Sequence, residues 1–542
     1  MKRTLCLFIL ITATTIYFWR TPAFSQNTKN AKPDTSKAKP NLELQDVIIY
    51  GTDKSLRTTG TKLQPGEEHL RLFKRPIDYQ PTMDGQPLPS GKATVAEQTT
   101  AMHSLTLVSL GYGQLSTPDV QAMHWQQFDA FNYGLDANFA QSDGEYINSQ
   151  FQRMSGSGHV GIQFQPEMFG EIRGIAGEQT FGLYGARVPT MERNAVAYAF
   201  SGALQTTLQA KHQLNAMVSW QRVYFSDAGT VTDTTSALSD ERTGSFMVSY
   251  QAPLPRRMQL NLAVNSDFIS TPEIDSSWQV MNYTADLLIP IGTHFSIRPA
   301  LVYEFVSNYT TRMSPGMEFV YTPSTRFGIS AKANRQLQLR SVRSLEKQNP
   351  YIATSVIPIV QDIMFNGEGT AELKLSSQLT ARASLSAQQI ADYAYWQRDS
   401  NGMFMLNTLN EITITTAGVA ATYDISPNQG FQTGFYYVID NSDVDAIPYL
   451  EDFRIPFELT MQLPYHIGIQ ASAIWMGTRY ADLAATQKLV DYVTGSFRVE
   501  KQLGKHMTLY SQIDNANDSN YEVWQGYPAF GFYTLIGISG KW

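Results

Sequence analysis

The feature that most constrains this chain is a long run of alternating segments. From about residue 104 to residue 542, successive segments of roughly nine to 16 residues alternate apolar and polar side chains. In one of them Met258, Leu260, Leu262 and Val264 alternate with polar or small residues. Successive side chains of a β-strand point to opposite faces, so this pattern predicts a sheet with one apolar and one polar face.

The length of the segments separates a membrane sheet from a soluble sandwich. Soluble strands usually have about 5 to 6 residues, whereas a strand that crosses a bilayer needs about 9 to 11. Two neighbouring segments, 368–375 and 379–386, are joined by the turn Ser376–Gln378 and carry Glu372, Lys374 and Arg382 on one face and leucines on the other. One face therefore requires lipid and the other requires water, which predicts an all-β, transmembrane antiparallel β-barrel over residues 104–542.

The connections follow a pattern typical of outer-membrane barrels, with short periplasmic turns and longer outer loops. Longer connections are predicted at 226–241, 338–362, 389–407 and 441–452, and short turns near residues 116, 167, 210, 255, 292, 324, 377, 427, 465 and 505. Four histidines (His212, His294, His466 and His506) fall at short turns and are interpreted as solvated turn residues. We count 21 strand-like segments after residue 104. Because such barrels have an even number of strands, we predict one more strand before residue 104 and about 22 in all, or 20 if one segment has been split.

Composition supports a membrane barrel and excludes other classes. Charged residues make up 16% of the chain, against about 25% in soluble domains, and aromatic residues make up 12%. The formal charge is -7, or -10 without Lys2, Arg3 and Arg20, which argues against nucleic acid as a partner. The single cysteine, Cys6, lies in the leader, so a mature chain would have no disulfide.

Residues 1–25 have the pattern of a cleavable signal peptide. Lys2 and Arg3 precede the apolar run Leu5–Trp19, which is short for a spanning helix, and Ala23–Ser25 fits the cleavage site. A retained anchor helix is the less favoured alternative. Residues 26–51 are predicted to be a disordered periplasmic tether. Residues 52–103 are irregular, and we predict that they fold partly inside the lumen, because a barrel of this width must be plugged.

The last segment ends in an aromatic residue. Phe532, Ile536, Ile538 and Trp542 share its apolar face. A ring at the end of such a strand suits the membrane interface. This pattern predicts a signal for the outer-membrane assembly machinery, and outer-membrane lipid as the surrounding partner.

The last fifty or so residues resemble a known family. Ser511–Asn515, Tyr521–Val523 and Gly526–Pro528, followed by the final strand, are similar to the end of TonB-dependent receptor barrels, although Ala529–Gly531 stands where that family usually has Pro-Gly-Arg. The resemblance implies 22 strands, solute uptake and a TonB-like energising partner.

A second stretch resembles the TonB box of that family, and it consists of Leu44, Gln45, Asp46, Val47, Ile48, Ile49 and Tyr50. Such a stretch could pair with the sheet of the energising partner, or it could be a strand docked on its own protein. Only about fifty residues separate it from the first barrel strand, too few for the plug domain of the family. The chain therefore resembles the plugless barrels seen in Bacteroidetes and relatives.

No catalytic or cofactor motif stands out. Ser155 and His159 lack the spacing of a nucleophile motif and are interpreted as residues at a junction between a loop and a strand. The acidic residues Asp440, Asp443, Asp445, Glu451 and Asp452 lack calcium-loop spacing and are interpreted as a solvated loop.

We therefore predict no enzyme activity, no metal and no cofactor. The polar residues Glu372, Lys374, Arg382, Arg498 and Glu500 are expected to face the lumen, where they either tune solute selectivity or only solvate the interior. Two functions remain open: solute uptake or transport across the outer membrane, with the substrate unknown, and a structural or partner-binding barrel with a closed lumen.

Overall fold

The computed structural model describes residues 104–542 except for 188–189, 209–210, 229–237, 273–274 and 427–428. The signal peptide, the tether with Leu44–Tyr50 and the lumen-filling segment all fall within residues 1–103, outside the described residues.

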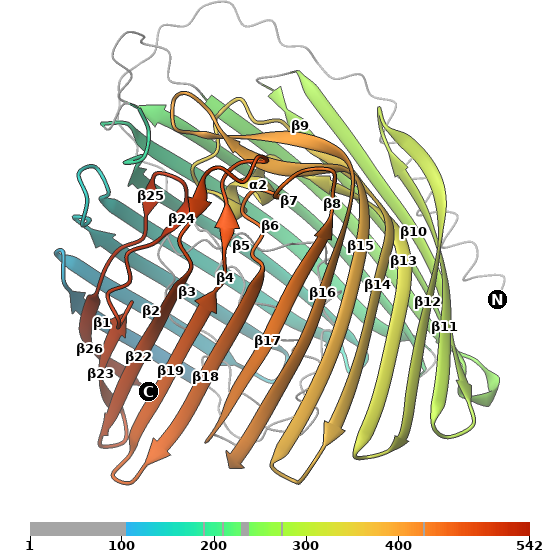
Figure 1. Ribbon diagram of the computed structural model, residues 1–542. Helices are drawn as coiled ribbons and strands as arrows, with labels where there is room; N and C mark the ends of the chain where they lie inside the picture. Colours follow the sequence, from blue (N-terminus) through green and yellow to red (C-terminus); the bar gives the residue numbers. More distant parts are fainter. Residues whose placement is uncertain (1–103, 188–189, 209–210, 229–237, 273–274, 427–428) are drawn as a thin grey trace, which may run out of the picture. The chain divides into compact units, whose positions relative to one another are not determined.

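The described residues form a closed antiparallel β-barrel of 22 strands, as predicted (Figure 1). Strand β26 pairs with β1 from Gly113↔Leu535 to Leu107↔Lys541, which closes the sheet. The barrel strands are β1 Ser104–Gly113, β2 Thr117–Gln127, β3 Phe131–Ser142, β4 Phe151–Gln165, β5 Met168–Gly182, β6 Glu192–Leu208, β7 His212–Ala228, β8 Leu238–Pro253, β9 Gln259–Thr271, β10 Ser276–Ile291, β11 Phe295–Val306, β12 Thr310–Ser324, β13 Phe327–Arg340, β14 Ile359–Lys374, β15 Leu379–Arg398, β16 Phe404–Ser426, β17 Gln429–Asn441, β18 Phe453–Leu463, β19 Ile467–Met476, β22 Tyr492–Leu503, β23 Met507–Asp514 and β26 Tyr533–Lys541.

The position of one predicted strand is wrong. All 22 strands of the sheet lie from Ser104 onward, so none is supplied by the chain before residue 104. The turn at 128–130, which separates β2 from β3, was not recognised in the sequence. Phe128 and Phe131 stack across this turn at 4.3 Å between ring centroids, and these two aromatic residues hide the turn among strand residues in the sequence.

The connections lie at two ends of the barrel. By the order of the strands, one end of the barrel has ten connections of two to five residues, and we call it the turn end. The nine predicted turns from 167 to 505 all lie at this end. The other end, called the loop end, has the connections 143–150, 183–191, 341–358, 399–403, 442–452, 477–491 and 515–532, among others. The connection 114–116 also lies at the loop end, so its prediction as a periplasmic turn is wrong. The length of a connection does not identify its end of the barrel, because the loop-end connections 114–116 and 307–309 are as short as those of the turn end.

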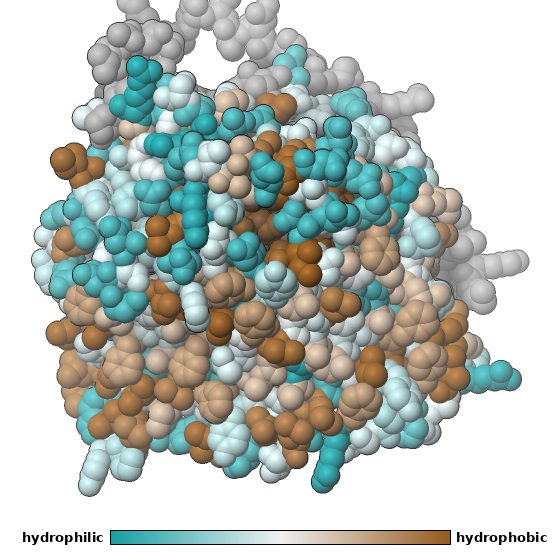
Figure 2. All heavy atoms as spheres, viewed as in Figure 1, coloured by the Kyte–Doolittle hydropathy of each residue, from teal (hydrophilic) through white to brown (hydrophobic). Residues whose placement is uncertain are grey.

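The outer face of the barrel is apolar and the inner face is polar. Leu373 and Leu385 are exposed on the outside, whereas Glu372 and Arg382 are direct cross-strand partners on the inner face of β14 and β15. Figure 2 shows apolar residues gathered over the lower half of the barrel wall, with polar surface above them towards the loop end. A closed barrel with such a belt has its backbone groups paired and its outer surface matched to lipid, which are the properties of outer-membrane barrels.

Helical structure in the described residues is confined to short segments. No helix in this part of the chain has the length and apolar character needed to span a membrane. The α-helix α2, Val342–Gln348, lies in the connection 341–358, and a 3-10 helix, Pro255–Arg257, forms a turn. Two small ladders also lie in loop-end connections: β20 Arg479–Tyr480 with β21 Lys488–Leu489, and β24 Glu522–Trp524 with β25 Tyr527–Pro528.

Candidate functional site

Six loop-end connections pack together into one hydrophobic core, which we call the loop cap. They are 183–191, 341–358, 399–403, 442–452, 477–491 and 515–532. The core continues onto side chains at the tops of β5, β6 and β7, such as Phe181 and Phe225. Loops of a membrane barrel usually face water, so a shared dry core among them requires a specific arrangement.

Aromatic rings form the centre of the loop cap. The rings of Tyr351 and Tyr527 stack at 3.7 Å between centroids, although the two residues belong to different connections. Trp524 lies 4.7 Å from Tyr449 and 5.2 Å from Phe404, measured between ring centroids. Trp524 is 1% exposed, so this centre is as dry as the interior of a soluble domain.

A two-stranded ribbon carries part of the cap across the mouth. Strands β15 and β16 have 20 and 23 residues, but β14 pairs with β15 only as far as Ala391, and β17 pairs with β16 only from Thr413. Beyond these points the two strands pair with each other and with no other strand of the described barrel, and Phe404 at the start of β16 also forms a parallel bridge with Ile352 of the connection 341–358. Figure 1 shows this ribbon curving over the loop end.

The tip of the ribbon meets the opposite wall. Arg187 N donates a hydrogen bond to Asn401 O at 2.7 Å, and Arg398 Nη2 donates one to Gly185 O at 2.6 Å. The connection 183–191 joins β5 to β6, ten strands away from β15 and β16 in a closed sheet of 22. The ribbon therefore spans the mouth of the barrel.

A buried ion pair holds the connection 341–358. The guanidinium of Arg193 on β6 donates to both carboxylate oxygens of Asp227 on β7, at 2.7 and 2.8 Å, and its Nη1 donates to Pro350 O at 2.8 Å. Arg193 is fully buried. A guanidinium removed from water requires such complete pairing, so the wall and the cap are joined by groups that cannot separate without a penalty.

The same connection is also fixed at the beginning of α2 and at its far end. Val342 N donates to Glu241 Oε2 of β8 at 2.6 Å, and Ser341 caps the helix by accepting from Ser344 N. Beyond the helix, Phe404 N donates to Tyr351 O at 3.0 Å. These bonds join the connection to the wall on one side and to the ribbon on the other.

The last connection, 515–532, lies across the others. Arg479 is 1% exposed and donates to the backbone oxygens of Glu522 and Val523 at 2.8 and 3.2 Å. Tyr184 donates to Pro528 O at 2.8 Å. Gly526 has φ +79°, and a Cβ there would lie 2.5 Å from Arg398 Nη2, so only glycine fits this position.

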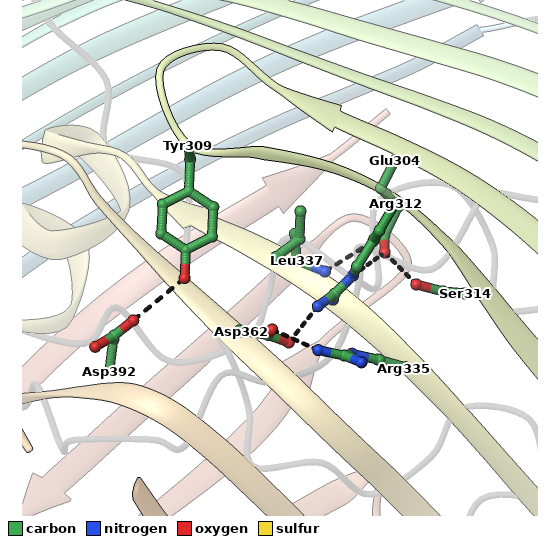
Figure 3. Close-up of polar contacts among 8 residues, drawn as sticks. All are labelled: Glu304, Tyr309, Arg312, Ser314, Arg335, Leu337, Asp362 and Asp392. Carbon is green, nitrogen blue, oxygen red and sulfur yellow. Dashed lines mark hydrogen bonds and ion pairs between the residues drawn. The ribbon is translucent and has the colours of Figure 1, made fainter. Parts of the chain in front are cut away.

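A network of charged side chains links β11, β12, β13 and β14 near the loop end, where β12 and β13 are not paired by backbone hydrogen bonds (Figure 3). Strand β12 pairs with β13 only between Gly316 and Ser324. The residues of the two strands nearest the loop end therefore have no backbone ladder between them. There Arg312 of β12 forms ion pairs with Glu304 of β11, at 3.0 Å, and with Asp362 of β14.

Further bonds complete the network. Asp362 also pairs with Arg335 of β13 at 2.7 Å. Glu304 accepts from Ser314 Oγ at 2.6 Å and from Leu337 N at 2.7 Å, which satisfies a carboxylate that is 2% exposed. The network replaces the missing ladder and holds β13 and β14 against β11 and β12 as they approach the cap.

Burial changes the proton affinity of cap residues. Desolvation raises the pKa of Glu346 in α2 to about 6, against the partial opposing effect of Arg193. Desolvation also raises the pKa values of Tyr449 and Tyr527, so both phenols are neutral at physiological pH. These two phenols therefore add no charge to the cap interior.

The structure confirms the expected lumen-facing residues of the wall. Arg498 lies 4.0 Å above the ring of Tyr510, and its Nε donates to Glu500 Oε1 at 2.7 Å. Glu372 and Arg382 face each other across β14 and β15, and Lys374 lies at the exposed end of β14. These residues belong to the barrel wall and not to the cap.

One sequence interpretation is corrected. Ser155 and His159 lie within β4 and not at a junction between a loop and a strand. The intervening glycines mimic a loop in the sequence, but Gly156 and Gly158 pair with β3 and β5 as ordinary strand residues. Four residues of strand separate the two side chains by about 13 Å, so they form no catalytic pair.

The other predicted residues are distributed as follows. Asp440 is the penultimate residue of β17, and Asp443 and Asp445 lie in the connection 442–452. The described residues contain no group of three or more His, Cys, Asp or Glu able to hold a metal. Ile536 and Trp542 are exposed on the outer face, as the alternation predicts.

The cap itself was missed in the sequence. The usable signal was the density of aromatic residues in 515–532, which is unusual for a solvated loop.

Comparisons with known proteins match the fold alone. No protein-family model matches the sequence. No curated protein matches it either. Among solved structures, the chain is similar to a mutant of the ferric enterobactin receptor PfeA from Pseudomonas aeruginosa, with a TM-score of 0.65, 10% identity, and coverage of 82% of this chain and 81% of that one.

Two further structures match over the same extent. The FrpB iron transporter from Neisseria meningitidis has a TM-score of 0.63 at 12% identity and 82% coverage of both chains. The siderophore receptor PirA from Acinetobacter baumannii has a TM-score of 0.65 at 10% identity, with coverage of 82% of this chain and 81% of that one.

Proposed function

We propose that this chain is an outer-membrane uptake barrel of the TonB-dependent receptor-like, plugless type, and that its loop cap is the outer gate. The single observation that carries the proposal is the dry core of the loop cap, which spans the mouth of a barrel that is otherwise wide and lined by polar residues. The fold is shared with a ferric enterobactin receptor and a siderophore receptor, which supports uptake as the general activity.

Orientation follows from the two ends of the barrel. Outer-membrane barrels have short periplasmic turns and longer outer loops, so the turn end faces the periplasm and the cap faces the outside. A solute must then pass the cap before it reaches the inner wall.

The inner wall suits a hydrated passage. Asn334, Asn366 and Gln388 form a chain of side-chain hydrogen bonds across β13, β14 and β15, and Lys332 pairs with Glu368 at 2.7 Å. Polar and paired residues of both signs would solvate a polar solute without retaining one sign of charge.

The energy for opening would come from the periplasmic side. We propose that Leu44–Tyr50 pairs with a TonB-like protein by adding a strand to its sheet, and that residues 52–103 occupy the lumen in the resting state. Under this arrangement the cap blocks the outer mouth and the amino-terminal segment blocks the interior.

Single-channel conductance in a planar bilayer tests the proposal. Three proteins are compared: the mature chain, the chain lacking residues 26–100, and that deletion with the substitutions Arg187→Cys and Asn401→Cys. The backbone hydrogen bond between Arg187 and Asn401 brings the two residues close together, as a disulfide requires, and no other cysteine is present in the mature chain.

We expect the deletion to conduct intermittently as the cap opens, and we expect the oxidised cysteine pair to abolish those openings until it is reduced. Openings that persist unchanged in the oxidised pair would contradict a gate at the cap.

A second function is favoured by one observation, the complete pairing of Arg193 with Asp227 and Pro350 in the cap. A permanently closed barrel that binds a partner would also require such a rigid cap. In that case neither the deletion nor the reduced cysteine variant would conduct, and removal of residues 44–51 would not affect growth on any solute.

A further inference from the structure

The turn end has a feature that is independent of the cap. Four consecutive turns, which join β6 to β7, β8 to β9, β10 to β11 and β12 to β13, contain Lys211, Arg256, Arg257 and Arg326. The sequence of these turns, 209–211, 254–258, 292–294 and 325–326, contains no aspartate or glutamate. We call the four cations the basic arc. The acidic turn residues Asp129 and Glu167 lie on other turns, and Lys505 is the one further lysine or arginine in the sequences of the turns at this end, so most of the positive charge lies on the side of β6 to β13.

The cations of the basic arc are available to a ligand. All four side chains are exposed. The ion pairs formed among the described residues, such as Lys332 with Glu368, include none of the four. Their charge is therefore not neutralised by the described part of the barrel.

The backbone conformation of the turn 254–258 does not favour the arginines that it contains. Arg256 and Arg257 have φ values of +60° and +62°, in the left-handed region that glycine and asparagine prefer. Two arginines in this conformation each add about 1 to 2 kcal/mol of strain. A turn that needed only to reverse the chain would be more stable with Asn-Gly, so the charge is the property that these residues contribute.

The level of the basic arc relative to the membrane follows from its apolar neighbours. Ile291, the last residue of β10, and Tyr321, three residues before the end of β12, are exposed apolar residues at this end of the barrel, as is Leu254 in the turn that contains Arg256. The border of the hydrocarbon layer therefore lies beside them. The turn residues that follow directly lie in the layer of lipid headgroups, where a cation meets phosphate.

We propose that the basic arc binds the phosphate of anionic phospholipid headgroups in the periplasmic leaflet. Exposed lysine and arginine next to an anionic membrane surface each contribute about 1 kcal/mol to binding. The amino-terminal segment of the same chain is a poorer occupant, because residues 26–103 contain 11 lysines and arginines against nine aspartates and glutamates and so carry charge of the same sign. Bound lipid would fix the rotation and height of the barrel in the membrane on the side of β6 to β13.

Native mass spectrometry of the full mature protein tests this proposal. The protein is mixed with equal amounts of dioleoyl phosphatidylglycerol and dioleoyl phosphatidylcholine in detergent, and the retained lipids are counted. The test variant carries Lys211→Gln, Arg256→Gln, Arg257→Gln and Arg326→Gln, which leaves the backbone strain of the 254–258 turn in place. Each cation removed should lower the ratio of phosphatidylglycerol to phosphatidylcholine up to about fivefold.

Two control variants separate charge at this site from folding and from total charge. Replacement of the three arginines by lysine retains the charge and should retain the preference. Lys505→Gln removes one exposed cation outside the basic arc, from the turn between β22 and β23, and should lower the ratio by no more than about fivefold, the loss expected for a single cation. The slower migration of unboiled barrel on a detergent gel would confirm that every variant is folded.

An equal lipid ratio in the wild type and the fourfold variant would overturn the proposal. So would an equal loss in Lys505→Gln, because the effect would then reflect net charge. Preferential retention of a bisphosphorylated glycolipid over phosphatidylglycerol would also overturn it, because that result would assign the basic arc to the other leaflet.

Discussion

Replacement of Trp524 by alanine should open the loop cap without unfolding the barrel. Trp524 is 1% exposed and has three aromatic neighbours, Trp396, Phe404 and Tyr449, at 4.7 to 5.8 Å between ring centroids. Truncation of a buried tryptophan to alanine reduces stability by about 3 to 5 kcal/mol, which combines lost transfer energy with the cavity left behind. Trp396 and Phe404 lie on the ribbon of β15 and β16, and Tyr449 lies in the connection 442–452, so the loss falls on the cap.

The magnitude sets the expected readout. A loss of about 4 kcal/mol raises the population of the open cap by roughly 10³-fold. Limited chymotrypsin digestion of the folded protein measures this population, because cleavage after Tyr521 or Phe530 requires those rings to leave the core. We expect the initial cleavage rate in 515–532 to rise by two to three orders of magnitude, on the order given by that free-energy loss.

A matched control removes the same side chain from another place. Trp475 is 44% exposed on the outer face of β19, so Trp475→Ala should leave the cleavage rate in 515–532 unchanged. The reasoning would be refuted if Trp524→Ala were as resistant as the wild type, or if the two variants were equally sensitive.

Four other perturbations test separate parts of the argument. Arg193→Met leaves the Asp227 carboxylate buried without its partner, so cap stability measured by digestion should fall by about 3 to 5 kcal/mol. If the additional change Asp227→Asn restores cap stability, a purely steric role for Arg193 is contradicted. The pKa of Glu346 is raised from 4.5 to about 6, so the cap should lose about 2 kcal/mol in all as pH rises from well below 4.5 to well above 6, and Glu346→Gln should remove this dependence in digestion rates measured across that range. Gly526→Ala, which introduces a Cβ at positive φ against a guanidinium, should lower cap stability by at least 1 kcal/mol in the same assay. Deletion of Trp542 should reduce the yield of folded barrel in outer-membrane fractions, and an undiminished yield would exclude it as an assembly signal.

The barrel was predictable because its determinants are local and repeated. Alternation places Leu373 and Leu385 outside and Glu372 and Arg382 inside, and each strand requires only its own pattern and a neighbour to pair with. The errors occurred where local composition conflicts with position. The turn at 128–130 was not recognised because Phe128 and Phe131 resemble strand residues. The glycines near Ser155 resemble a loop although they lie within β4.

The loop cap was not predictable in the same way. Its centre joins Phe404 of β16 with Tyr351, Tyr449 and Trp524, which lie on three separate connections, and these residues meet only when the barrel is closed. No period in the sequence specifies that the ribbon of β15 and β16 should reach 183–191, because that meeting depends on the width of a closed sheet and on where β14 and β17 stop pairing.

The sequence by itself determined a membrane barrel, its even strand number and the faces of its strands, because these follow from a two-residue period and from the need to pair every backbone group in lipid. Only the tertiary structure decided that the mouth is closed. Closure depends on contacts such as that of Arg193 with Pro350, between residues 157 positions apart, and the energy of such contacts becomes available only after the wall has formed.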